Sequence, residues 1–516
     1  SVVKALFFLH RWRRKRFSVF KDLGILGPTP SLFSGNLSEL VEKGAARCFE
    51  EWTKKYGDIV GFYNGGTPML IVKDLDLIKR IQIKDFGNFH GRGVTSRISR
   101  DHQVSKLSLV NVDGDRWKDM RSLLTPAFTS SNMKKISRLM DTSSDEFLEV
   151  LDSLHERDEA FEIRQVFQKL TMDVIVRSAF GVQSDVQKNP EMTGMNVIIK
   201  EILEGLTLFR TGWVNYLSAS FPEFSFIWRL VLTWRRRVIG SPFDNVNYGI
   251  IPIINMRRSN PQANLLQLML NAEAEEGAAV SVHQLTVGYE GETSQSDESK
   301  VSNRKRRVLT NAEIQSNAIV FLVAGFETTS TALTFTTYLL AKFQDVQDRL
   351  RSEITTVLKK DGKFTYDNVF SMRYLDQVIS ESLRFYPPVT GFPSKCCQFY
   401  LAKMQYNGRE PSLRIKSCQI SRISRFKNMP NKYHVGKSHH ENKYTAYDSQ
   451  SRNVVPLKYS RNQHFVKFAK YSISYCILSD QNILLLKLFQ EDHLKLGSSF
   501  VFCYPQDGAW LKVKKI

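Results

Sequence analysis

The chain has 516 residues, of which 42% are hydrophobic and 11% aromatic, so the sequence excludes a largely disordered protein and predicts a sizeable core. Its net charge of +20 is unevenly placed, because residues 391–516 hold 21 Lys and Arg against 7 Asp and Glu. The first 390 residues carry a net charge of only +6, which argues against a basic nucleic-acid-binding surface across the whole chain. Only Cys48 precedes Cys396, so this part has no disulfide framework and a reducing compartment is expected.

Residues 1–26 are expected to be the end of a membrane anchor followed by a basic linker. The apolar run SVVKALFFL is shorter than the roughly 20 residues that span a bilayer, and without a starting methionine it is expected to continue a longer segment. The cluster from Arg11 to Arg16 is typical of the cytoplasmic side of an anchor, although a solvated basic helix has the same pattern. The stretch LGPTP, Leu26 to Pro30, cannot be helical and predicts a stiff spacer.

The next elements are a helix and a hairpin. Apolar residues at helical spacing predict one helix over residues 37–57. Asn64-Gly65 lies between two apolar runs and predicts a β-hairpin over residues 58–74. The pattern is helical over residues 128–180 and 193–272, and the polar, glycine-containing composition of residues 275–307 predicts a surface loop.

A long helix follows, and its middle is chemically unusual. Thr310-x-x-Glu313 is a capping box, so the helix is predicted to start there and to run to about Lys342. Apolar residues on all faces predict that it is buried in a large α-rich globule. Glycine and threonine are both unfavourable in helix interiors, yet Gly325 and the hydroxyl run Thr328 to Thr331 lie at its centre. This turn is therefore a candidate site, the alternative being a buried turn whose hydroxyls bond back to their own helix.

Two further amphipathic helices are predicted over residues 343–360 and 373–386. The second sets Glu381 and Arg384 at i, i+3, where they can pair. An exposed pair of this kind is an ordinary surface bridge worth under about 1 kcal/mol.

Three sequence motifs resemble those of the cytochrome P450 haem-thiolate monooxygenases, and they occur along the chain in the family's order. The run Ala324-Gly325-Phe326-Glu327-Thr328-Thr329-Ser330 matches the family's oxygen-activation motif, A/G-G-x-D/E-T-T/S. Glu381-x-x-Arg384 matches its E-x-x-R motif, and Trp117-x-x-x-Arg121 looks like its haem-propionate helix. The resemblance covers about residues 3–399 and is nearest to the microsomal clan that holds drug-oxidising enzymes and thromboxane synthase.

The resemblance implies a mainly α fold with a small β-sheet region, incomplete at the C-terminus, with residues 27–399 as the catalytic domain. It implies that Trp117 and Arg121 donate to a propionate of haem, iron protoporphyrin IX. Glu381 and Arg384 would form a structural pair. An amphipathic helix with an exposed arginine is the alternative for residues 117–121.

The same resemblance assigns roles to the central helix. Ala324 and Gly325 would let the backbone approach the oxygen site closely. Thr328 would hold O₂ or water through its hydroxyl, and Glu327 would relay protons. Substrate contacts are expected from the aromatic-rich residues 208–228, from the loop before Trp117 and from residues 389–392.

The resemblance ends near residue 399, before the loop that carries the iron ligand. No metal ligand is identifiable, because none of the six cysteines stands in the family's F-x-x-G-x-R-x-C-x-G context. Residues 400–516 are basic and largely aperiodic, and they are expected to be a poorly ordered tail outside the family pattern. Three interpretations stay open: a mis-spliced or read-through gene model, a truncated isoform, or a functional basic tail that binds RNA or membrane.

The expected function is insertion of one oxygen atom from O₂ into a small apolar substrate, a xenobiotic, steroid or lipid. Electrons would come from NADPH through a flavoprotein reductase, on the cytoplasmic face of the endoplasmic reticulum membrane, and no nucleic acid partner is expected. The alternative is a haem-free, non-catalytic, membrane-associated protein, because the ligand cysteine is missing.

Overall fold

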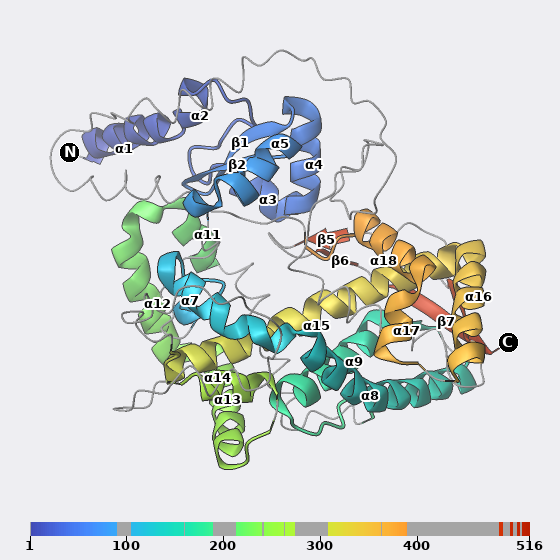
Figure 1. The fold of residues 1–516 in the computed structure, drawn as a ribbon. Helices are drawn as coiled ribbons and strands as arrows, with labels where there is room; N and C mark the ends of the chain where they lie inside the picture. Colours follow the sequence, from blue (N-terminus) through green and yellow to red (C-terminus); the bar gives the residue numbers. More distant parts are fainter. Residues whose placement is uncertain are drawn as a thin grey trace, which may run out of the picture.

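The computed structural model describes residues 2–89, 105–158, 160–188, 213–239, 242–262, 264–273, 308–362, 364–389, 484–488, 496–498, 503–505 and 508–515. These ranges are mostly helical, with small antiparallel sheets, which confirms the predicted fold class (Figure 1). The expected surface loop of residues 275–307 lies outside the described residues.

The N-terminal part contains helices α1 and α2, the spacer, helices α3 and α4 and a hairpin. Their bounds are α1 Val2–Arg16, α2 Val19–Asp22, α3 Leu37–Lys43, α4 Ala45–Tyr56, β1 Ile59–Asn64 and β2 Thr67–Val72. The predicted single helix over residues 37–57 is divided at Gly44, whose positive φ of 82° a continuous helix does not permit. The predicted hairpin is confirmed, and Asn64 opposes Thr67 at its turn.

The spacer of residues 26–30 is not helical, as predicted, and it packs against the hairpin. The backbone N–H of Gly61 donates to the carbonyl of Leu26 at 2.9 Å. A side chain at Gly27 would overlap the carbonyl of Gly61, so only glycine permits this close approach.

The helical body begins after the hairpin. Its first half consists of α5 Leu75–Lys79, the π-turn η1 Arg80–Lys84, the 3₁₀ turns η2 Phe86–Asn88 and η3 Ser105–Leu107, α7 Gly114–Leu124, the 3₁₀ turn η4 Thr125–Phe128, α8 Ser130–Glu156, β3 Phe161–Glu162, α9 Ile163–Ile175 and the π-turn η5 Val176–Phe180. Its second half consists of α11 Trp213–Ser220, η6 Pro222–Phe224, α12 Ser225–Ile239, α13 Pro242–Ser259 and α14 Leu265–Asn271.

The central helix α15, Asn311–Lys342, crosses the middle of the molecule in Figure 1. Both halves of the predicted capping box form: the Thr310 hydroxyl accepts from the Glu313 N–H, and the Glu313 carboxylate accepts from the Thr310 N–H. Within the described residues α15 is the one helix long and apolar enough to cross a membrane, but 67% of its apolar window is buried in the protein. It is therefore a core helix, as predicted.

Two apolar clusters pack against α15. The first half of α15 packs with α7, η5, α13 and α14 around Met120, Phe180 and Leu266. The second half packs with α8, α9 and three helices that follow it, α16 Gln344–Asp361, α17 Tyr366–Ser371 and α18 Arg373–Phe385. The predicted apolar faces of α16 and α18 lie in this second cluster.

The C-terminal segment contributes strands to the body of the molecule. They are β4 Leu484–Leu488, β5 Leu496–Ser498, β6 Cys503–Pro505 and β7 Trp510–Lys515. Strand β7 pairs with both β4 and β3, and Ala509 and Leu511 are buried in the same cluster as Phe161. Residues 400–516 were expected to form a separate, poorly ordered tail, whereas their last strand is part of the packed core.

Candidate active site

One turn in the middle of α15 is accessible although the helix is otherwise mostly buried. Ala324 is exposed and Thr328 is half-buried, whereas Ser330 to Tyr338 are buried. Residues four apart lie on the same face of a helix, so Ala324 and Thr328 form one accessible patch. The predicted motif is therefore accessible to solvent on the helix face that holds Ala324 and Thr328.

The hydroxyl of Thr328 donates to the carbonyl of Ala324 at 2.6 Å. Such back-bonds also form from Thr334 to Ser330 and from Thr336 to Ala332, at 2.7 and 2.9 Å. The helix is continuous through the motif, so glycine and the hydroxyls do not interrupt its backbone ladder. What sets Thr328 apart from the buried threonines is access to its hydroxyl oxygen, which keeps acceptor capacity while it donates.

Gly325 lies at a close contact between α15 and α9. A side chain at Gly325 would overlap the end of the Ile175 side chain on α9. The small residue therefore lets α9 pack closely against α15. The expectation that Gly325 also lets the backbone approach the oxygen site stays a prediction.

Glu327 is buried and turned toward α9. Its carboxylate accepts from the guanidinium of Arg164 at 2.5 Å and from the amide of Gln168 at 3.1 Å. Arg164 and Gln168 are one turn apart on α9, so they hold both oxygens of the carboxylate. The negative charge of Glu327, the acid expected to relay protons, is thus balanced by the guanidinium of Arg164. Sequence reasoning missed both partners because they lie about 160 residues away in the chain.

Trp117 and Arg121 lie one turn apart on α7, and both are half-buried. The Trp117 ring also contacts Phe86, with ring centroids 5.7 Å apart. An indole N–H and a guanidinium on one helix face are hydrogen-bond donors suited to a carboxylate, which fits the predicted propionate contacts.

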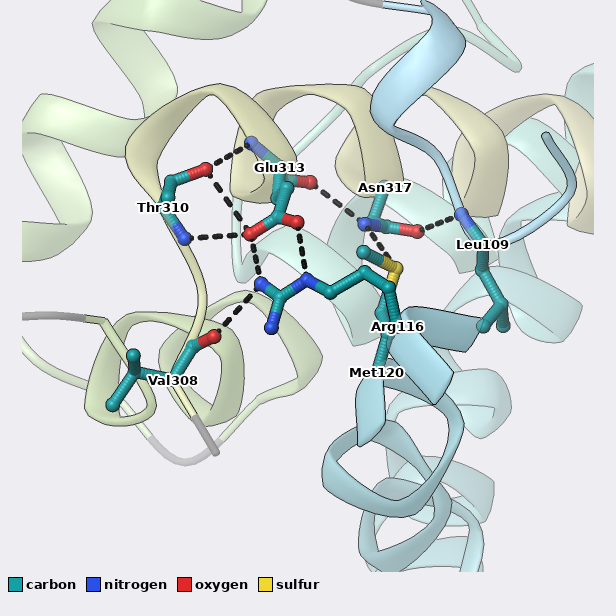
Figure 2. Close-up of polar contacts among 7 residues, drawn as sticks. All are labelled: Leu109, Arg116, Met120, Val308, Thr310, Glu313 and Asn317. Carbon is teal, nitrogen blue, oxygen red and sulfur yellow. Dashed lines mark hydrogen bonds and ion pairs between the residues drawn. The ribbon is translucent and has the colours of Figure 1, made fainter. Parts of the chain in front are cut away.

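Helix α7 is fixed to the start of α15 by a polar network (Figure 2). Arg116 donates to both carboxylate oxygens of Glu313, and its Nη2 also donates to the Val308 carbonyl at 2.8 Å. Asn317 accepts from the Leu109 N–H at 2.9 Å and donates to the Glu313 carbonyl at 2.7 Å. The network sets how α7, with Trp117, lies against α15, and Arg116 had no local sequence signal beyond its charge.

The predicted pair of Glu381 and Arg384 forms on α18. The Arg384 Nε and Nη2 donate to the two Glu381 oxygens at 2.7 and 2.5 Å. The hydrogen bonds from Arg384 lower the pKa of Glu381 despite partial burial. The Glu381 side chain is 57% exposed, so in the described structure this pair is an exposed bridge.

Two of the six cysteines, Cys48 and Cys503, lie in the described ranges. Burial raises the pKa of the Cys48 thiol to about 11, and its Sγ donates to the Glu39 carbonyl, so it is a protonated core residue of α4. Cys503 lies in β6, and within the described ranges no cluster of three His, Cys, Asp or Glu could hold a metal. Cys396, Cys397, Cys418 and Cys476 lie outside the described residues. The α7 donors suit a propionate, and the predicted roles of Trp117, Arg121 and Thr328 toward haem stay predictions.

The aromatic-rich segment expected to contact substrate faces outward in part. Phe224 is 43% exposed, Phe226 71% and Ile227 51%. These side chains cannot line an interior substrate site in this structure. Residues 208–212 and 390–392 lie outside the described ranges, so the expectation for them is untested.

Comparisons with known proteins agree with the motifs. A cytochrome P450 family model matches residues 25–399. Cytochrome P450 6B1 of Papilio polyxenes is 28% identical over 535 residues, covering 98% of this chain and 97% of that protein. Cytochrome P450 3A31 of Mesocricetus auratus is 30% identical, covering 74% of this chain and 70% of its own. The first alignment necessarily extends beyond residue 399, since it leaves only 2% of the chain unmatched. The chain belongs to the cytochrome P450 family.

Proposed function

We propose that this chain is built to insert one oxygen atom from O₂ into small apolar molecules at the cytoplasmic face of the endoplasmic reticulum membrane. Its family uses haem and O₂, with electrons taken from NADPH through a reductase. A flavoprotein reductase is the proposed partner. The observation that carries the proposal is the accessible turn at Ala324 and Thr328 in the middle of a buried helix.

Four residues of this chain would bind haem, orient water or carry protons in the reaction. When bound, haem supplies the activation of O₂. Trp117 and Arg121 would hold a propionate through an indole N–H and a guanidinium. Thr328 would orient a water molecule at the accessible patch, because its hydroxyl proton is already committed to the Ala324 carbonyl. Glu327 would act as a proton carrier only after leaving its salt bridge with Arg164, so Arg164 limits that role.

One observation favours a second candidate, a haem-free, non-catalytic membrane-associated protein. No cysteine of the sequence stands in the loop context that the family uses for its iron ligand. The thiolate of that ligand sets the spectrum of the reduced carbon monoxide complex. We therefore expect the chain with its own C-terminal segment to lack the thiolate-type Soret band when it is reduced under carbon monoxide. Appearance of that band would show that a ligand exists and would remove this alternative.

A chimaera separates the two outcomes. Residues 393–483 would be replaced by the matching segment of the Papilio polyxenes relative, and β4 to β7 would be kept because β7 is packed in the core. The chimaera should show the thiolate band. In it, Thr328→Ala should raise the hydrogen peroxide formed per NADPH consumed. The matched control is Thr336→Ala, which loses the same type of back-bond at a buried position. Equal peroxide yields from the two variants would contradict the role given to Thr328.

A further inference from the structure

One arginine of α13 is buried without a carboxylate partner. Arg257 lies in the last turn of α13 and is only 1% exposed. Within the described ranges no acidic side chain forms an ion pair with it, whereas its neighbour Arg258 pairs with Glu273 at 2.5 Å. Burial lowers the pKa of the Arg257 guanidinium. Because a charge without a partner is unfavourable away from water, Arg257 is a candidate for binding a negatively charged ligand.

Backbone carbonyls surround part of this guanidinium. Its Nη2 donates to the carbonyls of Phe180 and Gly181 at 2.8 and 2.9 Å, and its Nη1 donates to the Asn260 carbonyl at 3.1 Å. Phe180 is the last residue of η5, so Arg257 lies at the carbonyl end of that turn, where a positive charge is favourable. The buried Nε of Arg257 has no hydrogen-bond partner. The carbonyls therefore neither satisfy every donor of the guanidinium nor balance its net charge.

A second unsatisfied donor lies beside the guanidinium. Asn264 is the N-cap of α14, and its Oδ1 accepts from the Gln267 N–H at 2.9 Å. Its Nδ2 is buried and has no hydrogen-bond partner. A Cβ added at Gly181 would lie 2.7 Å from the Asn264 Nδ2 and 2.8 Å from the Arg257 Nη2. The cation and the amide with the unused donor therefore meet over Gly181.

Glycine at position 181 leaves room between these two groups. Its φ of +66° is in the left-handed region, and a side chain there would occupy the space that Arg257 and Asn264 border. Gln262 also borders this space, with its Oε1 2.7 Å from the same Cβ position. The Gln262 side chain is exposed, so its amide can turn to present N–H in place of oxygen. A ligand at this place would thus be surrounded mainly by N–H donors.

We propose that Arg257 and Asn264 bind a small monovalent anion of the chloride type over Gly181. The anion balances the charge of the buried guanidinium and accepts hydrogen bonds from the unused N–H groups of the two side chains. A single cation suits a single negative charge, whereas a phosphate dianion would bring more charge than Arg257 balances. The site uses the side-chain amide of Asn264, because its oxygen is already committed to capping α14.

The elements that meet at this anion site all pack against the first half of α15. The turn η5 and the helices α13 and α14 contribute Phe180, Ile254 and Leu266 to the apolar cluster of that half. In Figure 1, α13 and α14 lie side by side near the start of α15. The anion is therefore a structural ligand that stabilises α14 against its neighbours. This inference goes beyond the proposed function and involves neither haem nor oxygen.

The site is tested by hydrogen–deuterium exchange of the full-length chain at constant ionic strength, with sodium chloride replacing sodium gluconate, whose anion is too large for the site. Peptides that contain α14 should exchange about tenfold more slowly when chloride reaches about ten times its dissociation constant, because binding lowers the population of the open form by that factor. Peptides from α16, which packs against the second half of α15, should not respond. Exchange of α14 that does not respond to molar chloride would overturn the proposal.

Asn264→Asp is the decisive variant, because it places a carboxylate beside Arg257 and keeps an oxygen that can cap α14. It should slow α14 exchange in the absence of chloride and remove the chloride response.

Two arginine variants complete the test. Arg257→Gln should also remove the chloride response, whereas Arg258→Gln, at the 37% exposed neighbour, is the matched control and should keep it. Asn264→Asp adds a counter-charge rather than removing a contact, so it decides the question if Arg257→Gln does not fold. A chloride response of unchanged size in Asn264→Asp, or its loss in Arg258→Gln, would overturn the site. None of these readouts requires bound haem, so failure of the oxygenase function would leave them unaffected.

Discussion

Replacing Arg116 with alanine should destabilise the protein more than the loss of any exposed ion pair of α7. In Figure 2 this residue bridges two helices, with both carboxylate oxygens of Glu313 as its partners. Glu313 is 5% exposed, so its charge stays buried when Arg116 is removed. Breaking a fully buried ion pair by removing one partner costs about 3–5 kcal/mol.

Two features reduce that figure for Arg116. Its side chain is 36% exposed, so water screens part of the interaction. The Glu313 carboxylate also keeps the hydrogen bonds from the Thr310 N–H and hydroxyl, at 2.9 and 3.1 Å. We therefore expect Arg116→Ala to cost about 2 kcal/mol of the free energy of unfolding.

The measurement is the shift of the urea unfolding midpoint at unchanged slope, followed by circular dichroism. Lys118→Ala on the same helix is the control, because Lys118 pairs with Asp115 at the surface, where the two side chains are 58% and 93% exposed. It should cost under about 0.5 kcal/mol. Adding Glu313→Gln to Arg116→Ala should recover part of the loss, because the buried charge is then gone. Equal costs for Arg116→Ala and Lys118→Ala, or no recovery, would refute this reasoning.

Three further predictions concern other parts of the fold. Leu511→Ala should lower the free energy of unfolding by about 2–3 kcal/mol in thermal or urea unfolding, because Leu511 is fully buried. Trp510→Ala, at a neighbouring residue that is 38% exposed, should lower it less. Equal losses from the two variants would place β7 outside the core. Gly35→Ala should lower the melting temperature by several degrees, because φ is +59° and an added Cβ would overlap the Gly65 carbonyl; an unchanged melting temperature would contradict that contact. Burial raises the pKa of Glu313, but hydrogen bonds from Arg116 and Thr310 outweigh it and leave the pKa below its ordinary value. The stabilisation is therefore complete above the ordinary carboxyl range of about 4.3 and is lost as the pH falls through the lower folded pKa, so Glu313→Gln should flatten the acid limb of a stability profile.

Features whose cause is local were predictable from the sequence. The capping box of Thr310 and Glu313 and the turn at Asn64-Gly65 each depend on residues within a few positions of one another, and both form as predicted. The core faces of α16 and α18 follow from helical periodicity in the same way. Gly44 is the exception, because a glycine in an amphipathic pattern is compatible with either a continuous or a divided helix.

Features that depend on residues far apart were not predictable from one sequence. Glu327 was recognised as part of a motif, but its partner Arg164 lies 163 residues earlier and has no pattern that marks it. Arg13 was grouped with the other basic residues of the cluster from Arg11 to Arg16, but Arg13 is buried while its neighbour Arg14 is exposed. The sequence pattern does not distinguish the buried Arg13 from the exposed Arg14. Only the packing of Ser220 and Phe33 around α1 distinguishes them.

The last strand shows how an expected tail bears on the site. Strand β7 pairs with β3 at Phe161 and Glu162, and the Ile163 N–H donates to the Ala509 carbonyl at 3.0 Å. Arg164 follows at once and holds the carboxylate of Glu327. The pairing of β7 therefore fixes the first turn of α9, and through it the counterion of the motif acid on α15. If β7 were detached, Arg164 would lose the backbone that positions it, and Glu327 would become a buried carboxylate with a weakened partner, which is an unfavourable state. Strand β7, near the end of the sequence, therefore helps to position Arg164 and, through Arg164, the carboxylate of Glu327.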